Sequence, residues 1–168
     1  MKVVILCGGA GTRLREETEY RPKSMVEIGG KPILWHIMKI YSRFGYNDFI
    51  LCLGYKGWMI KDYFLNYDYR NNDFTITLGI NSSIEFTRQE TEHFRVTLAE
   101  TGLETLTGGR VKRIEKYITE DTFMLTYGDG LADINIADLV KFHKDHGKLA
   151  TVTVTQPSSR YGIVALDR

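Results

Sequence analysis

The sequence predicts an α/β fold with a mostly parallel, twisted sheet, helices on both faces and a small antiparallel excursion in the middle. Strand-like apolar runs alternate with segments whose apolar residues recur at helical spacing, which is typical of strand–helix–strand units. The strand-like runs are short and continuously apolar, as expected of parallel strands buried on both faces. Between residues 74 and 98, apolar and polar residues alternate instead, which indicates antiparallel strands.

Each element has a local signal. The expected strands of the main sheet are residues 3–7, 49–53, 123–127 and 149–155. The expected helices, each with an apolar stripe, are residues 32–44, 58–65 and 136–146. Their expected start and end residues are Pro32, Gly45, Asp133 or Asn135, and Gly147. The expected strands of the antiparallel excursion are residues 74–78, 83–86 and 94–98.

The chain has neither an internal repeat nor a linker, so we expect one domain over residues 1–168. Residues 162–168 have the pattern of a strand that has just begun, with no turn or cap after it. We therefore expect the chain to lack the C-terminal part of its domain.

Composition narrows the classes of function. The formal net charge of the 168 residues is +1, so charge gives no support to general binding of nucleic acid. Cys7 and Cys52 lie inside apolar runs, where we expect buried thiols rather than a metal pair or a disulfide. No apolar run is as long as a signal-peptide core or a membrane span, so we expect a cytoplasmic protein.

The turn after the first strand is the most informative segment. That strand is followed directly by GGAGTRL at residues 8–14, and Pro22 and Lys23 come shortly after. Glycines let the backbone approach a ligand closely and point N–H groups at it. Arg13 adds paired donors suited to phosphate, and Lys23 adds a compact charge. Backbone donors with two cations indicate a site for a polyanion, most simply a nucleoside triphosphate.

Three other interpretations of this turn fit less well. A dinucleotide fingerprint needs a third glycine, which is absent, and its acidic ribose partner would be Glu27, which is not at a clear strand end. A P-loop needs Gly-Lys-Ser/Thr, but the GK at residues 30–31 is followed by proline. A plain tight turn does not require Thr12 and Arg13.

The whole string resembles the signature of sugar-phosphate nucleotidyltransferases, GGxGTRL followed after a short gap by Pro-Lys. The resemblance continues through KSMVEIGGKPILWHIM at residues 23–38, LGYKG at 53–57, TGGR at 107–110 and YGDG at 127–130. It implies a Rossmann-like nucleotidyltransferase fold. Within the family, the chain is most similar to members that use CTP and glucose 1-phosphate, which usually continue well past residue 168.

The implied reaction transfers CMP from CTP to glucose 1-phosphate and gives CDP-glucose and pyrophosphate, with Mg²⁺ as cofactor. The attacking oxygen belongs to a phosphate whose second pKa is about 6, so it is largely ionised near neutral pH and needs no general base. The sequence agrees, because it has no Ser-His-Asp or Cys-His arrangement near the glycine turn. The remaining task is to align two anions and to offset their repulsion.

The resemblance assigns roles residue by residue. Arg13 and Lys23 are the expected catalytic residues, at the departing pyrophosphate and at the α-phosphate. Asp129 is the expected Mg²⁺ ligand, because it follows a buried strand at the edge where such sheets bind ligands; a plain turn residue is the alternative. Arg110 is expected to approach a phosphate, with a solvated helix face as the alternative. The other expected substrate-binding residues are Leu6, Gly8, Gly9, Ala10, Gly11, Thr12, Thr107, Gly108, Gly109 and Gly128.

Two other functions stay open at this stage. A non-catalytic nucleotide-binding module is one, although it would not require both Lys23 and Asp129. A uridylyl- or thymidylyltransferase is the other, because the glycine turn alone does not separate the bases. The crowded aromatic residues between 58 and 69 are expected in the core or in a contact between subunits. We expect a homo-oligomer that has no nucleic-acid or membrane partner.

Overall fold

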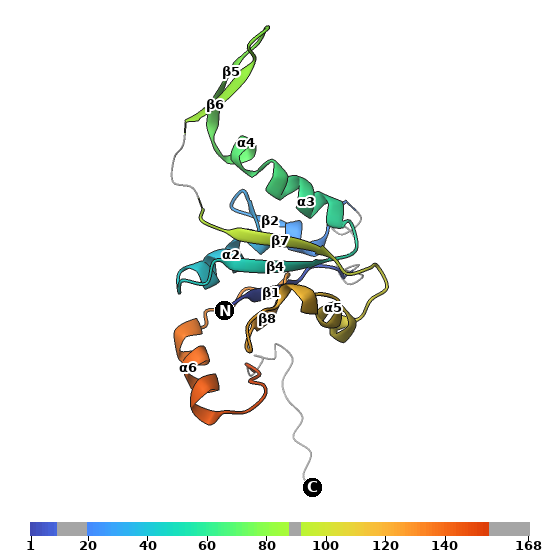
Figure 1. Cartoon of the computed structure of the whole chain (residues 1–168), viewed down its shortest axis with the longest axis vertical. Helices are drawn as coiled ribbons and strands as arrows, with labels where there is room; N and C mark the ends of the chain where they lie inside the picture. Colours follow the sequence, from blue (N-terminus) through green and yellow to red (C-terminus); the bar gives the residue numbers. More distant parts are fainter. Residues whose placement is uncertain (10–19, 88–91, 155–168) are drawn as a thin grey trace, which may run out of the picture. The chain divides into compact units, whose positions relative to one another are not determined.

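The computed structural model of the chain describes residues 1–9, 20–87 and 92–154. Contacts divide the chain into two compact units, Met1–Asp133 and Ile134–Arg168, and each is described by itself. The expectation of one domain over residues 1–168 stays a prediction. The first unit contains a four-stranded sheet (Figure 1).

All neighbouring strands of this sheet run parallel, as predicted. In their order across the sheet they are β7 (Arg95–Glu100), β4 (Asp48–Leu53), β1 (Val3–Leu6) and β8 (Met124–Tyr127). In the register of the sheet, Val4 lies opposite Ile50 on one side and Leu125 on the other. The carboxyl ends of the four strands therefore meet at one edge of the sheet.

The placement of β7 corrects the sequence prediction. Residues 94–98 are expected in the antiparallel excursion, but β7 pairs in parallel with β4. β7 has only β4 as a described neighbour, and its residues are mostly half-buried or exposed. A strand at such a position alternates between apolar and polar residues whether its pairing is parallel or antiparallel, so the alternation could not decide the pairing.

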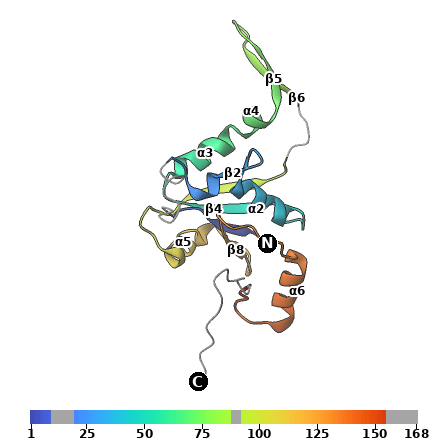
Figure 2. The same ribbon diagram turned by 180° about the vertical axis from the view of Figure 1, so that it is seen from behind.

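Helices cover both faces of the sheet (Figures 1 and 2). Successive side chains of a strand point to opposite faces. Val3, Ile5 and Phe49 accordingly pack in one buried cluster with side chains of α2 (Ile33–Ser42) and α3 (Gly57–Leu65). The intervening residues of the strands form a second buried cluster with Ile114, between α5 (Thr107–Arg113) and η2 (Glu115–Tyr117).

The predicted helices are confirmed, with small shifts at their ends. α2 and α3 lie within two residues of the predicted ranges, and Gly45 follows α2 with a φ of 83°. In the second unit, α6 (Ile136–His146) has the predicted bounds. The side chain of Asn135, rather than Asp133, accepts hydrogen bonds from two N–H groups of its first turn, and Gly147 ends it with a φ of 62°.

Two hairpins stand outside the main sheet. β5 (Asp73–Thr77) and β6 (Ser83–Thr87) pair antiparallel, which confirms the predicted excursion, and α4 (Tyr67–Asn71) precedes them. A second hairpin, β2 (Glu27–Ile28) with β3 (Lys31–Pro32), is not predicted from the sequence. Its turn consists of Gly29 and Gly30, whose φ values of 58° and 79° are those of a glycine-rich hairpin turn.

The fourth predicted strand of the main sheet is not present over residues 149–154, which are neither helix nor strand; residue 155 lies outside the described residues. A strand requires a neighbour for its backbone hydrogen bonds, and no described strand pairs with this segment. No helix within the described ranges is both long and apolar enough to cross a membrane.

Candidate active site

A pocket of about 290 Å³ lies at the carboxyl ends of β1 and β8. These strands are neighbours, but the chain runs from β1 to β4 and β7 on one side before it returns to β8 on the other. Open α/β sheets bind ligands at the carboxyl edge where the strand order reverses in this way. The residues that line the pocket are 6–9, Lys23, Ser24, 105–107, Arg110 and 127–129.

The pocket brings together predicted site residues that are far apart in the sequence. Those that line it are Leu6, Gly8, Gly9, Lys23, Thr107, Arg110, Gly128 and Asp129. Gly108 and Gly109 belong to α5 but do not line the pocket. The rest of the predicted glycine turn, Ala10, Gly11, Thr12 and Arg13, lies outside the described residues.

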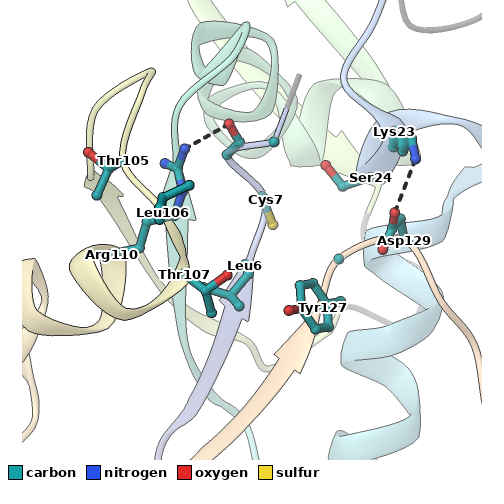
Figure 3. A pocket seen from close by; sticks show the side chains of 13 residues that line it. Leu6, Cys7, Lys23, Ser24, Thr105, Leu106, Thr107, Arg110, Tyr127 and Asp129 are labelled. Atoms are coloured by element: carbon teal, nitrogen blue, oxygen red, sulfur yellow. Dashed lines mark hydrogen bonds and ion pairs between the residues drawn. The ribbon is translucent and has the colours of Figure 1, made fainter. Parts of the chain in front are cut away.

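Lys23 and Asp129 face each other across the mouth of the pocket (Figure 3). Lys23 opens the short 3-10 helix η1 (Lys23–Met25), which follows Pro22 in extended conformation. Asp129 comes two residues after β8. The Lys23 Nζ and Asp129 Oδ2 atoms are 3.6 Å apart, and 21% and 43% of the two side chains are exposed. A pair this accessible contributes little to stability, so both groups are available to a charged ligand.

Close packing explains the glycine before Asp129. The N–H of Gly128 donates a hydrogen bond of 3.1 Å to the carbonyl of Leu6. A Cβ atom at Gly128 would lie 3.0 Å from Cys7 Sγ and 3.1 Å from the Leu6 carbonyl oxygen. Gly128 therefore lets the segment after β8 stay close to the end of β1, which places Asp129 at the pocket.

Arg110 forms the opposite wall, and its burial is not that of a residue on a solvated helix face. Only 5% of the residue is exposed. Its Nη2 donates to the carbonyls of Gly8 and Leu103, at 3.0 and 3.1 Å. Its Nη1 donates to Thr101 Oγ1 and to the carbonyls of Leu53 and Gly102 at 2.7, 3.0 and 2.8 Å. The two terminal nitrogens are thus directed at protein oxygens, whereas the sequence led us to expect a phosphate as their partner.

The loop between β7 and α5 supplies the upper part of this wall. Arg113 Nη1 donates to the Thr101 carbonyl at 2.6 Å and to Thr105 Oγ1 at 2.8 Å. Gly102 has a φ of 89°, which favours glycine at this bend. α5 has seven residues and no side-chain cap at Leu106. The first residues of α5 are therefore held at the pocket by the loop that Arg110 and Arg113 bind, and not by a side-chain cap.

Several lining residues are missed by sequence reasoning. They are Cys7, Ser24, Thr105, Leu106 and Tyr127. Each lies one or two positions from a predicted residue. Closeness in the sequence to a predicted motif was therefore the signal that could have identified them. Tyr127 is the last residue of β8, and 61% of it is exposed beside the pocket (Figure 3).

Both cysteines are buried and free, as predicted. Burial raises the pKa of the Cys7 thiol well above its ordinary value. Burial also raises the pKa of Cys52 to about 11, and the positive charge of Arg110 opposes part of that increase. Cys7 lines the pocket, but a thiol held neutral in this way is a poor nucleophile at neutral pH.

The donor set around Asp129 fits Mg²⁺ better than a metal that needs a complete protein cage. No group of three or more His, Cys, Asp or Glu side chains that could hold a metal ion occurs among the described residues. Mg²⁺ commonly uses one or two carboxylates and completes its shell with phosphate oxygens and water. Asp129, accessible at the pocket mouth, matches that requirement.

Comparison with known families agrees with this geometry. The model of a family described as nucleotidyl transferase matches residues 2–168. The chain belongs to the nucleotidyl transferase family. The predicted fold class and family are therefore confirmed, and the dinucleotide-fingerprint and P-loop interpretations of the glycine turn are wrong.

Individual members of the nucleotidyl transferase family extend the comparison. The chain is 54% identical over 168 residues to a glucose-1-phosphate cytidylyltransferase of Salmonella typhimurium, covering 99% of this chain and 64% of that protein. It is 48% identical over 167 residues to a probable glucose-1-phosphate cytidylyltransferase of Bacillus subtilis, covering 99% of this chain and 65% of that protein. The chain thus spans about two thirds of the length of these relatives.

Solved structures show the same fold. The crystal structure of HddC from Yersinia pseudotuberculosis complexed with GMP-PN is similar with a TM-score of 0.60 and 28% sequence identity. The match covers 86% of this chain and 54% of that chain. A UDP-glucose pyrophosphorylase complexed with UDP-glucose has a TM-score of 0.62 at 15% identity, which supports the fold alone.

Proposed function

We propose that this protein transfers CMP from CTP to glucose 1-phosphate, giving CDP-glucose and pyrophosphate, in a reaction that depends on Mg²⁺. Membership of the nucleotidyl transferase family supports the reaction class. Similarity to the Salmonella typhimurium and Bacillus subtilis proteins supports these two substrates. The observation that carries the proposal is a pocket that combines Gly8 and Gly9, the first residues of the glycine turn, with Lys23 and Asp129 at the reversal of the strand order.

The pocket suits a displacement between two phosphates. The N–H groups of the glycine turn bind the base edge and phosphates of CTP, and Lys23 binds the α-phosphate where charge shifts during the reaction. The oxygen of glucose 1-phosphate attacks the α-phosphorus, and the bond from that phosphorus to pyrophosphate breaks. Arg13 binds the departing pyrophosphate through paired N–H groups. The protein accelerates this reaction by aligning the two substrates and by holding positive charge in place against their phosphates.

Asp129 would hold Mg²⁺, which when bound neutralises part of the charge on the phosphates. The same carboxylate is 3.6 Å from Lys23, so the two groups balance each other's charge before substrate arrives. A bound phosphate replaces Asp129 as the partner of Lys23. Thr107 lines the pocket from the first turn of α5. We expect it to lie near the cytosine or the ribose.

A panel of CTP, UTP, dTTP and GTP, each with glucose 1-phosphate and Mg²⁺, tests the function directly. Pyrophosphate release should be fastest with CTP and absent without Mg²⁺. Titration calorimetry of the chain with CTP and Mg²⁺ tests binding separately from turnover. Another preferred nucleotide would overturn the base assignment, and binding without turnover in any nucleotide would favour a non-catalytic nucleotide-binding module.

We also propose a cytoplasmic homo-oligomer. Trp58 and Tyr69, in the aromatic segment that suggests a subunit contact, are 66% and 58% exposed. Tyr63 in the same segment is buried, so that part of the segment belongs to the core. Light scattering coupled to size exclusion should give a mass above 19.3 kDa for this chain. A monomeric mass at all concentrations would contradict the proposal.

A further inference from the structure

Arg110 is a buried cation whose surroundings are oxygens without formal charge. Its five hydrogen-bond acceptors are four backbone carbonyls and the hydroxyl of Thr101. No acidic side chain forms an ion pair with it within the described ranges. A buried charge is costly to desolvate, so a guanidinium with this environment indicates a specific task rather than general stabilisation.

The space that Arg110 occupies is created by two glycines. A Cβ atom at Gly8 would overlap Nη1 and Cζ of Arg110 and would lie 2.9 Å from Nη2. A Cβ atom at Gly54 would lie 2.7 Å from Nη1 and 2.6 Å from the Gly8 carbonyl oxygen. The Arg110 side chain therefore requires glycine at position 8, whether or not a ligand is bound.

Arg110 also determines how the first peptide of the glycine turn is oriented. The Gly8 carbonyl accepts from Arg110 Nη2 at 3.0 Å and from the N–H of Tyr55 at 3.1 Å. In a trans peptide the C=O and the following N–H point in opposite directions. Two donors on the Gly8 carbonyl thus turn the N–H of Gly9 away from Arg110, and Gly9 itself lines the pocket.

The same guanidinium joins three segments of the pocket wall. It links the turn after β1 to the end of β4 through Leu53 and to the β7–α5 loop through Gly102. Thr101, which is completely buried, completes the link, because its Oγ1 accepts from Nη1 and donates to the Leu53 carbonyl at 2.6 Å. One buried side chain therefore holds the three segments together.

We propose that Arg110 is the positioning residue of the nucleotide site, which acts on CTP through the peptide between Gly8 and Gly9 and not through a phosphate. This assignment rests on the proposed function, since the peptide that Arg110 orients opens the turn that would bind CTP. It explains why a cation in the pocket wall directs its terminal nitrogens at protein oxygens, and why positions 8 and 54 carry glycine.

A double-mutant cycle tests the proposal. Gly8→Ala, Arg110→Ala and the double variant are compared with the wild-type chain for CTP affinity, by calorimetry with Mg²⁺ at a temperature where thermal scans show every variant folded. Each single change should weaken CTP binding by about ten- to a hundredfold, as expected when a charged hydrogen bond is lost. The double variant should bind CTP at least as tightly as the single variant with the lower CTP affinity, because Arg110→Ala vacates the space that a side chain at position 8 requires.

Each other outcome has a distinct meaning. If the decreases in CTP affinity caused by the two single changes multiply in the double variant, the positioning role is wrong. It is also wrong if the variants lose stability but keep full CTP affinity. A wild-type chain that does not bind CTP would instead overturn the proposed function. Lys112→Ala, an exposed change on the same helix, is the matched control and should bind as the wild type does.

A second variant covers the case in which Arg110→Ala does not fold. Thr101→Val keeps the shape of the side chain and removes the hydroxyl between Arg110 and Leu53. It should weaken CTP binding by about three- to tenfold, less than Arg110→Ala does, because Arg110 keeps its hydrogen bond to the Gly8 carbonyl. Arg110→Lys keeps the charge without the paired donors and should restore only a small part of the affinity; full restoration would show that charge alone is required.

Discussion

The two walls of the pocket hold their cations in opposite ways. On one side, Lys23 is partly exposed, and within the described residues its ion-pair partner is a single carboxylate, that of Asp129, at 3.6 Å. On the other side, Arg110 is buried and its terminal nitrogens donate to five protein oxygens. Lys23 can exchange its partner for a ligand, whereas Arg110 would have to break several buried hydrogen bonds to do so.

The comparison shows that a cation near a phosphate site is not necessarily a phosphate ligand. A reacting charge has to meet the substrate, and an accessible side chain with one weak partner can do this. A charge that fixes the backbone has to be immobile, and burial among carbonyl oxygens makes it so. The following predictions test this division, from the largest expected effect to the smallest.

Replacement of Lys23 removes the mobile cation. Lys23→Ala should lower the rate of pyrophosphate release by about 10²–10³-fold, as the loss of one preorganised contact to the reacting phosphate typically does. CTP affinity, measured by calorimetry, should fall much less. Equal losses of rate and affinity would indicate that Lys23 only binds nucleotide, and the two walls would then differ less than we infer.

Replacement of Gly54 disturbs the fixed wall. Gly54→Ala should lower the free energy of unfolding by about 1–3 kcal/mol, because its Cβ would press against backbone atoms that cannot move freely. Those atoms include the Gly8 and Gly102 carbonyl oxygens, at 2.6 and 3.0 Å. Urea denaturation measures the change. Gly108→Ala is the control: nothing lies within 4 Å of its Cβ, so it should stabilise α5 by up to about 1 kcal/mol.

Replacement of Asp129 distinguishes its ion pair with Lys23 from its proposed role as a Mg²⁺ ligand. Asp129→Asn removes a negative charge that competes with phosphate for Lys23, so CTP binding without Mg²⁺ should become about fivefold tighter, the scale of one exposed ion pair. With Mg²⁺ present, the variant should instead bind CTP more weakly than the wild type, since the proposed metal ligand is lost. Titrations with Mg²⁺ and with a chelator distinguish these effects, and a change of the same sign in both would contradict the metal role of Asp129.

Alkaline pH tests the neighbourhood of Arg110. The pKa of Cys52 is raised from its ordinary value of 9.0 to about 11 in the folded chain. A pKa raised by folding gives a contribution to stability that is complete below pH 9 and is lost as the pH rises through 11. The free energy of unfolding should therefore fall less between these pH values in Cys52→Ala than in the wild type. Parallel pH profiles for the two proteins would show that the buried thiol does not titrate in this range.

The local parts of the fold could be predicted because local patterns cause them. The bounds of α6 follow from helical spacing between Asn135 and Gly147, and the apolar runs of β1 and β4 are long enough to identify buried strands. The β2–β3 hairpin was missed although its two glycines carried the signal, because each strand has only two residues. Two residues are too few for a periodicity to be recognised.

The sequence by itself determined the strand that leads into the glycine turn, the alternation of strands and helices, and the motif residues that meet at one pocket. These depend on spacing along the chain. Only the tertiary structure decided that β7 joins the main sheet and that Arg110 binds the Gly8 carbonyl, from which it is separated by 102 positions. The orientation of a long cationic side chain depends on which distant oxygens surround it, and no local pattern encodes those oxygens.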